Sequence, residues 1–238
     1  MNMFKRMASI VVMAVMMLQI AVFAAPVPED VIGTEYEGAA SLLCALEIMV
    51  GDGSDFKPDD NVTRAEFAKI LIKTLNLDSA SEAYTPTGLF TDVPTSEWYA
   101  APVEIGAGIG AIKGYGDGTF GPDNNVLGTE AVKMMTYACG HDITAEANGG
   151  YPAGYMATAQ QIGLLKGISS IDFSQPMTRG QAAVLCANTL KVDMKKKVSE
   201  GDKIIYEEIK DVNLLSEKHD VYKAEGVISA NDVTSMWE

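Results

Sequence analysis

The stretch GYGDGTFGPDNNV, residues 114–126, concentrates the side chains and glycines that often hold a metal ion or a phosphate. A calcium loop places acidic or amide oxygens in the order D-x-[DN]-x-[DN]-G, with a bidentate Glu at the end. Neither this stretch nor the related GDGSDFKPDD at 51–60 follows that order. The stretch also lacks the G-K-[ST] ending of a phosphate loop. We therefore expect a connecting loop and no metal site.

The residue types for catalysis are equally sparse. His141 and His219 lie in polar surroundings, and neither shows the H-E-x-x-H spacing of a zinc site. The 32 acidic residues offer many carboxylate pairs, but nothing marks one pair for glycoside hydrolysis. Cys44, Cys139 and Cys186 lie in apolar segments without a C-x-x-C, which favours buried free thiols over a disulfide or a metal site. We expect no catalytic residue, no cofactor and no enzyme activity.

Two arginines stand where a cation could bind an anion. Arg64 and Arg179 follow threonines in TRAE and TRGQ, which carry the capping-box signature of a helix start. A guanidinium binds a carboxylate through two parallel hydrogen bonds, and free N–H groups of the first helical turn are expected to assist. The alternative is that an Arg at a helix start is solvated or salt-bridged.

The elements that carry these arginines occur three times along the chain. Each copy has an apolar helix, a glycine that ends it, a turn with an aromatic residue, and the start of a second apolar helix. The helix-ending glycines are Gly51, Gly114 and Gly167. In the second copy, Leu127 replaces the capping threonine and Gly128 replaces the arginine. Each unit is too small for a core of its own, so the three should pool their apolar faces.

The two ends of the chain differ from this pattern. Residues 1–24 contain Lys5 and Arg6, then an apolar run, then small residues, which predicts a secretory signal peptide rather than an uncleaved membrane anchor. No later segment is long and apolar enough to span a bilayer. Residues 193–238 are expected to be a linker that begins with a basic patch, followed by a β-hairpin in the part that starts at His219.

Charge limits the partners. Removing Lys5 and Arg6 from the 18 basic residues leaves 16 against 32 acidic residues. Nucleic acid and anionic membrane surfaces require a basic footprint, so both are poor partners.

Taken together, FTDVPTSEWYA at 90–100, GYGDGTFGP, TRAE and TRGQ resemble the S-layer homology domain. The resemblance covers three consecutive copies, at 28–82, 88–142 and 148–192. Asp30-Val31 in the first copy matches Asp92-Val93, whereas the third copy has only GGYPAGYMA at that place. The resemblance implies a mainly α fold, with three helix–loop–helix repeats in a pseudo-threefold arrangement around a central helical bundle. A short β-type C-terminal tail follows.

The same resemblance implies a function. Proteins of this family are similar in anchoring to Gram-positive-type cell walls without catalysis. They bind peptidoglycan-linked secondary cell-wall polysaccharides, often with pyruvate ketals on amino sugars, in grooves between repeats. We therefore expect a secreted protein of the cell wall and cell surface. The alternative is a structural surface-layer protein whose repeats mediate self-assembly with other surface-layer proteins.

The family's motif arginine carries over to Arg64 and Arg179. Weaker candidates come from the groove-lining loop, from an aromatic residue and from lysines that precede the helix-ending glycines: Trp98, Lys113, Tyr115, Asp117 and Lys166. Aromatic rings stack on sugar faces, which would be the role of Trp98 in binding. The alternative is that Trp98 packs against the start of a helix. The two lysines would suit a helix C-terminus without any ligand.

Overall fold

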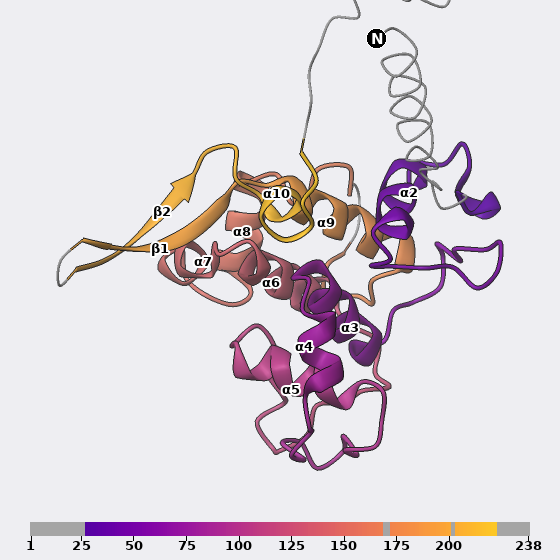
Figure 1. Ribbon diagram of the computed structural model, residues 1–238, viewed down its shortest axis with the longest axis horizontal. Helices are drawn as coiled ribbons and strands as arrows, with labels where there is room; N and C mark the ends of the chain where they lie inside the picture. The colour runs from indigo at the N-terminus through magenta and orange to yellow at the C-terminus, as the bar shows by residue number, and fades with distance from the viewer. Residues whose placement is uncertain (1–26, 169–171, 201–202, 223–238) are drawn as a thin grey trace, which may run out of the picture.

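The computed structural model describes residues 27–168, 172–200 and 203–222, which form a mainly helical structure with a two-stranded sheet (Figure 1). The mainly α fold is therefore confirmed. The predicted signal peptide, residues 1–24, lies outside the described residues.

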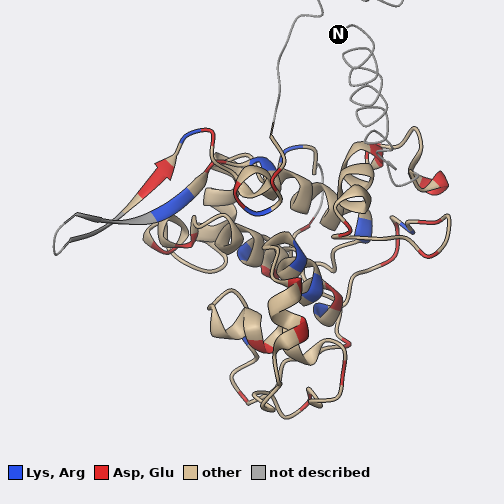
Figure 2. Cartoon of the chain, in the orientation of Figure 1, with Lys and Arg blue, Asp and Glu red and all other residues tan. Residues whose placement is uncertain are grey.

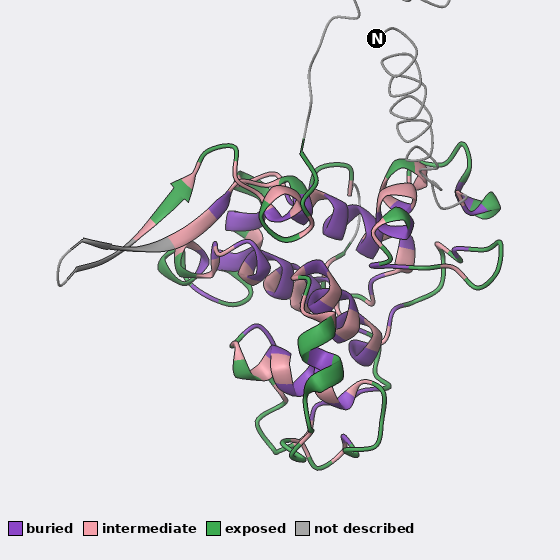
Figure 3. Cartoon of the chain, viewed as in Figure 1, coloured by how far each residue is buried: buried purple, intermediate pink, exposed green. Residues whose placement is uncertain are grey.

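The helices follow the predicted copies in order. The first copy contains η1 (Glu29–Val31), α2 (Glu37–Ala45) and α3 (Arg64–Thr74), followed by α4 (Asp78–Ala83). The second contains α5 (Ala100–Gly108) and α6 (Gly128–Ala138), followed by α7 (Asp142–Ala147). The third contains α8 (Ala153–Gln161) and α9 (Arg179–Lys191). The helices α3, α6 and α9 are largely buried (Figure 3).

Three extended residues, one before each of α3, α6 and α9, join the copies. The N–H of Val62 donates to the carbonyl of Met177 (3.0 Å), that of Met177 to Val126 (2.9 Å), and that of Val126 back to Val62 (2.9 Å). All three residues are fully buried. This closed ring of hydrogen bonds supports the pseudo-threefold arrangement, which as a whole stays a prediction.

The starts of these helices are fixed by the predicted caps. Thr63 and Glu66 form a reciprocal capping box, with the N–H of Thr63 donating to the Glu66 carboxylate (2.8 Å) and the N–H of Glu66 donating to the Thr63 hydroxyl (3.2 Å). Thr178 makes the same pair of bonds with Gln181. In the second copy only half of the box remains, because Leu127 offers a backbone N–H but no side-chain acceptor.

The Asp-Val pair of the first two copies has a clear structural role. Asp92 accepts hydrogen bonds from the N–H groups of Phe120 (2.8 Å) and Gly121 (2.7 Å). Asp30 accepts the equivalent bonds from Phe56 (2.7 Å) and Lys57 (2.6 Å). Each aspartate therefore fastens the aromatic turn of its own copy to the start of that copy.

A buried carboxylate fastens the connection between the first two copies. Glu104 on α5 is 3% exposed. It accepts hydrogen bonds from the Tyr84 hydroxyl (3.0 Å) and from the N–H groups of Gly88 (2.7 Å) and Leu89 (3.1 Å). It also accepts two bonds from the N–H of Thr87 (3.0 and 2.8 Å) and one from its hydroxyl (2.9 Å). Burial opposes the charged form, but these donors outweigh it and lower the pKa of Glu104 to about 2.

The three cysteines are buried and free, as predicted. Burial raises the pKa of Cys139 and of Cys186 to about 12. These thiols are therefore unreactive parts of the core.

The short β-type tail is confirmed, but its strands lie earlier in the chain than expected. Strands β1 (Met194–Glu200) and β2 (Lys203–Ile209) occupy the part that was expected to be a linker, and α10 (Leu214–Lys218) follows. The antiparallel register pairs Lys195 with Glu208 and Lys196 with Glu207. Figure 2 shows the basic strand beside the acidic one. The charges that looked like linker composition are thus complementary across the sheet.

The hairpin predicted from His219 onward lies mostly outside the described residues, at 223–238. Its described part, through Tyr222, is in no strand. The tail is also packed rather than detached. Leu214 is fully buried, the N–H of Lys195 donates to the carbonyl of Cys139 (3.0 Å), and His219 contacts the carbonyl of Thr74 (2.9 Å).

Candidate ligand-binding site

A pocket of about 300 Å³ lies between the start of α3, the loop after α5, and α6. Its charged and aromatic lining residues are Arg64, Lys113, Tyr115, Glu130, Lys133 and Tyr151. Three cations therefore face a single carboxylate, in a chain whose formal net charge is −14. The structure brings together three of the predicted residues, Arg64, Lys113 and Tyr115, and adds Lys133 and Tyr151, which were not predicted.

Arg64 is built into the wall of this pocket. It is 3% exposed, and its guanidinium donates to the carbonyls of Phe120 (2.8 Å) and Lys113 (3.1 Å) and to the Glu130 carboxylate (2.5 Å). The guanidinium carbon also lies 4.6 Å from the ring centre of Phe120 and 4.8 Å from that of Tyr115. Arg64 thus holds the loop of the second copy against the first, and it is already ion-paired.

The helix N-termini do not offer free donors, so that expectation is wrong. The N–H of Arg64 donates to the carbonyl of Asn124 (2.8 Å), and the N–H of Ala65 donates to that of Pro122 (3.0 Å). Arg179 at the start of α9 donates in the same way to the carbonyl of Asp60 (2.8 Å). The first helical turns are used to join one copy to the next, and an anion must be bound by side chains.

Lys113 and Tyr115 are available side chains. Lys113 is exposed, and its ammonium has no hydrogen-bond or ion-pair partner among the residues that the structure describes. Tyr115 is 51% exposed, and its hydroxyl accepts a hydrogen bond from Asn124 (3.1 Å). The stack of Tyr115 on Arg64 holds its ring in place beside the pocket.

Lys133 and Tyr151 line the same pocket as Lys113 and Tyr115. The Lys133 ammonium lies 5.7 Å from the ring centre of Tyr151, whose hydroxyl is 3.0 Å from that of Thr129. Burial, followed by the positive charge of Lys113, holds the pKa of Lys133 below its usual value. Tyr151 comes from GGYPAGYMA, the part of the third copy that looked degenerate. Only the fold shows that it reaches a pocket of the second copy.

A second pocket, of about 280 Å³, lies where the third copy meets the first. Arg179 lines it and donates to the carbonyls of Phe56 (2.9 Å) and Val50 (3.1 Å). It has no carboxylate partner within the described ranges. When Gly51 is aligned with Gly114, Val50 and Asp52 occupy the positions of Lys113 and Tyr115. Asp52, Asp60 and Glu66 outnumber Lys57 and Arg179 in the lining, so this pocket is weakly acidic.

At the junction between the second and third copies, Phe173 lies close against the start of α6. A Cβ placed on Gly128 would lie 2.9 Å from three atoms of Phe173, two of them in its backbone. An arginine therefore does not fit here in the present packing. Gly128 therefore differs from Arg64 and Arg179 in two ways: it carries no charge, and it packs closely against Phe173.

The other predicted residues lie apart from the two pockets. Trp98 is 55% exposed and packs edge-on against Tyr99, with ring centres 5.3 Å apart. Asp117 accepts hydrogen bonds from the N–H (2.9 Å) and hydroxyl (2.6 Å) of Thr119, which lower its pKa and shape the turn. Lys166 is exposed, and its carbonyl accepts a bond from Asn188 (2.7 Å).

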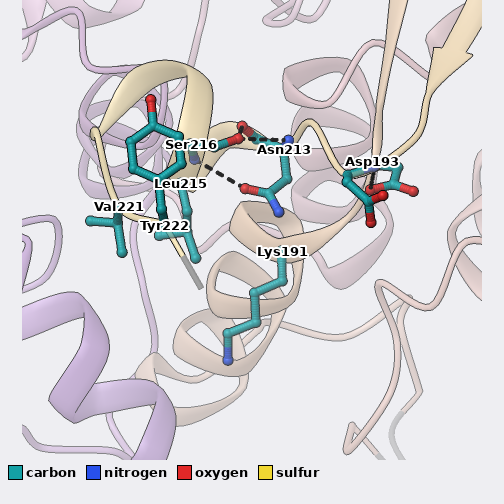
Figure 4. Close-up of a pocket in the computed structure, with 8 residues that line it drawn as sticks. Lys191, Asp193, Asn213, Leu215, Ser216, Val221 and Tyr222 are labelled. Atoms are coloured by element: carbon teal, nitrogen blue, oxygen red, sulfur yellow. Dashed lines mark hydrogen bonds between the residues drawn. The ribbon is translucent and has the colours of Figure 1, made fainter. Parts of the chain in front are cut away.

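A larger hollow of about 840 Å³ lies between the end of α9 and α10 (Figure 4). Asn213 and Ser216 there bond to each other, and Asp193 accepts from the N–H of Asp211 (3.1 Å). Its polar groups are thus largely engaged, and it contains none of the predicted residues. In the described ranges we find no group of three His, Cys, Asp or Glu side chains placed to hold a metal ion. No helix of the same ranges has the length and apolarity to cross a membrane.

The family model described as the S-layer homology domain matches residues 29–68 and 89–132. These segments cover parts of the first two predicted copies. The match therefore supports the resemblance there, and the third copy rests on the internal repeat alone.

Curated relatives point in the same direction. The chain is 28% identical over 181 residues to the "Middle cell wall protein" of Brevibacillus brevis, covering 76% of this chain and 17% of that protein. It is 28% identical over 169 residues to the "Surface layer protein" of Brevibacillus choshinensis, covering 71% and 15%. It is 37% identical over 78 residues to the "Cellulosome-anchoring protein" of Acetivibrio thermocellus, covering 33% and 17%. The chain thus spans less than one fifth of these relatives.

Proposed function

We propose that this chain is a secreted, non-catalytic anchoring module of the cell surface. It binds a peptidoglycan-linked secondary cell-wall polysaccharide non-covalently, in the pocket between the first and second copies. The observation that carries the proposal is the excess of cations in that pocket: Arg64, Lys113 and Lys133 against Glu130. Local positive charge in a chain of net charge −14 indicates an anionic ligand.

The chemistry of the pocket favours an acidic sugar, such as one carrying a pyruvate ketal. A carboxylate accepts charge-assisted hydrogen bonds from ammonium groups, and the half-exposed rings of Tyr115 and Tyr151 offer flat faces for sugar rings. The names of the cell wall, surface layer and anchoring relatives agree with attachment at the cell surface. The second pocket, where three carboxylates face two cations, is less favourable for the same ligand.

A pull-down with purified wall sacculi tests this proposal. The chain should sediment with intact sacculi and stay in solution after acid extraction of the secondary polymer. Lys113→Gln should weaken sedimentation roughly tenfold through loss of a charge-assisted contact, whereas Lys166→Gln, the lysine at the equivalent place in the third copy, should not. Binding that survives extraction unchanged would exclude the polymer as the ligand.

The alternative function is a structural surface-layer protein that self-assembles, as the name of one relative suggests. Analytical ultracentrifugation at increasing protein concentration distinguishes the two. A protein that stays monomeric and still binds sacculi acts as an anchor, and concentration-dependent assembly without sacculus binding would support the alternative.

A further inference from the structure

The ammonium of Lys133 is a partly buried cation without a partner. Across residues 27–168, 172–200 and 203–222, no hydrogen bond or ion pair reaches it, and it lies 5.7 Å from the ring centre of Tyr151. Desolvating an ammonium is costly unless an anion compensates. A single cation–aromatic contact returns only about 0.5–2 kcal/mol. The site is therefore electrostatically incomplete.

The carboxylates near Lys133 are engaged elsewhere. Glu130 uses one oxygen for Arg64 (2.5 Å) and the other for the N–H of Leu127 (3.0 Å). Glu146 accepts a hydrogen bond from the hydroxyl of Tyr155 on one of its two oxygens (2.9 Å). Both carboxylates act to raise the pKa of Lys133. Burial and the positive charges of Lys113 and Arg64 outweigh them, so the pKa is lowered overall. An external anion is left to complete the site.

We infer that Lys133 and Tyr151 are specificity-determining residues of this pocket, where Lys133 and Lys113 bind one carboxylate of an acidic glycan from two sides. The ring of Tyr151 stacks on the sugar that carries this carboxylate, opposite Tyr115. The inference rests on the proposed function. It follows from the pocket lining, since Lys113, Tyr115, Lys133 and Tyr151 all face the same space.

The positions equivalent to Lys133 in the other two copies do not provide a second lysine that lines a pocket. Counting from the helix starts at Arg64, Gly128 and Arg179, the position of Lys133 is Lys69 in the first copy and Val184 in the third. Lys69 does not line the second pocket. Lys69 is therefore a matched control for Lys133.

Isothermal titration with a synthetic pyruvylated disaccharide and with its methyl ester tests the inference. Lys133→Gln should weaken binding of the acid roughly tenfold or more, and Lys133→Arg should stay within about threefold of the unmodified chain. With the neutral ester, the unmodified chain and Lys133→Gln should bind equally. Tyr151→Ala should weaken both ligands by a similar factor, since stacking does not require the acid. Lys69→Gln should change neither.

The pH dependence adds a readout that a structural role would not give. As the pH is raised from 7 toward the ordinary lysine pKa of 10.5, Lys133 loses its proton early, because its pKa is lowered. Affinity for the acid should therefore fall with rising pH in the unmodified chain and fall less in Lys133→Arg, which stays charged. Thermal melts establish that each variant is folded.

The outcomes separate the two proposals. If Lys113→Gln loses the acid and Lys133→Gln keeps full affinity, the inference is wrong and the proposed function stands. Equal losses of acid and ester in Lys133→Gln would show a structural role and also overturn the inference. If the unmodified chain binds neither the disaccharide nor sacculi, the proposed function fails first.

Discussion

Arg64 joins two copies of the repeat through a single buried guanidinium. Its partners are two backbone carbonyls and the Glu130 carboxylate, and its own exposure is 3%. Arg179 has two carbonyl partners, is half-buried and has no ion pair within the described ranges. The same motif position therefore carries a structural residue in one copy and a more accessible cation in another.

Arg64→Ala should destabilise the fold by roughly 3 kcal/mol, because it leaves Glu130 and two carbonyls without their donor. Arg179→Ala should cost about 1 kcal/mol, since it breaks hydrogen bonds at a half-exposed site. Urea unfolding followed by circular dichroism measures both. Equal losses would show that the Glu130 ion pair contributes nothing to stability.

Glu104 is a second structural residue, and its effect depends on pH. Its pKa in the folded state, about 2, lies below the ordinary Glu value of 4.5. The carboxylate therefore stabilises the fold above pH 4.5, and this contribution is lost as the pH falls from 4.5 toward 2. The shift corresponds to about 3 kcal/mol at neutral pH.

Glu104→Gln should consequently destabilise the protein by up to about 3 kcal/mol at pH 7. The difference from the unmodified chain should shrink as the pH is lowered, because the carboxylate becomes protonated. Urea titrations at pH 7, 4 and 3 measure the trend. Glu97→Gln is a suitable control, since Glu97 makes no side-chain hydrogen bond within the described residues. A difference that stays constant with pH would show that the charge of Glu104 does not stabilise the fold.

At the scale of elements, the loop of one copy receives the helix start of another. The first N–H groups of α3, α6 and α9 donate to the carbonyls of Asn124, Gln175 and Asp60 respectively. The loop at 114–126 thus receives the start of α3 through the carbonyls of Pro122 and Asn124. Gly114 itself is required by close packing, because a Cβ there would lie 2.4 Å from the Thr119 carbonyl oxygen.

Gly128→Arg tests whether adding the missing arginine creates an anion-binding site at the junction between the second and third copies. The new side chain would meet Phe173 at 2.9 Å, so we expect destabilisation of about 1–3 kcal/mol by overpacking. No gain in binding of an acidic disaccharide should follow. Gly38→Ala in α2 is the control, since its added Cβ meets nothing within 4 Å. A stable variant with a second binding event would refute this packing argument.

At the scale of the whole molecule, the three copies form a closed ring yet differ at each junction. The pocket at the first junction has an excess of cations, the pocket at the second has a slight excess of carboxylates, and at the third Phe173 lies against Gly128. Val62, Val126 and Met177 are buried together, so the segment around Met177 belongs to the shared core.

A stoichiometry of one acidic ligand per chain should follow. Isothermal titration measures it directly, and affinity should fall as salt is raised, because the binding groups are partly exposed cations. Lys57→Gln in the acidic pocket is the control and should change neither affinity nor stoichiometry. Two or three equivalent sites would contradict the distinction between junctions.

The amino-acid sequence by itself predicted the main helices, the caps at Thr63 and Thr178 and the free cysteines. These are local properties, such as apolar periodicity and a threonine three residues before Glu66 or Gln181. Arg64 and Lys113 could be proposed for the same reason, since each has a fixed place within its own copy. The predicted helix ends were wrong, because α2, α5 and α8 end at Ala45, Gly108 and Gln161, before the glycines at 51, 114 and 167.

The tertiary structure alone decided which side chains share a pocket. Lys133 and Tyr151 are separated along the chain, and Tyr151 lies in a part of the third copy with little sequence signal. Arg64 is a buried structural residue because its hydrogen-bond partners, Phe120, Lys113 and Glu130, all come from another copy. Burial and pairing between copies depend on how the ring closes, and no local pattern of residues specifies that.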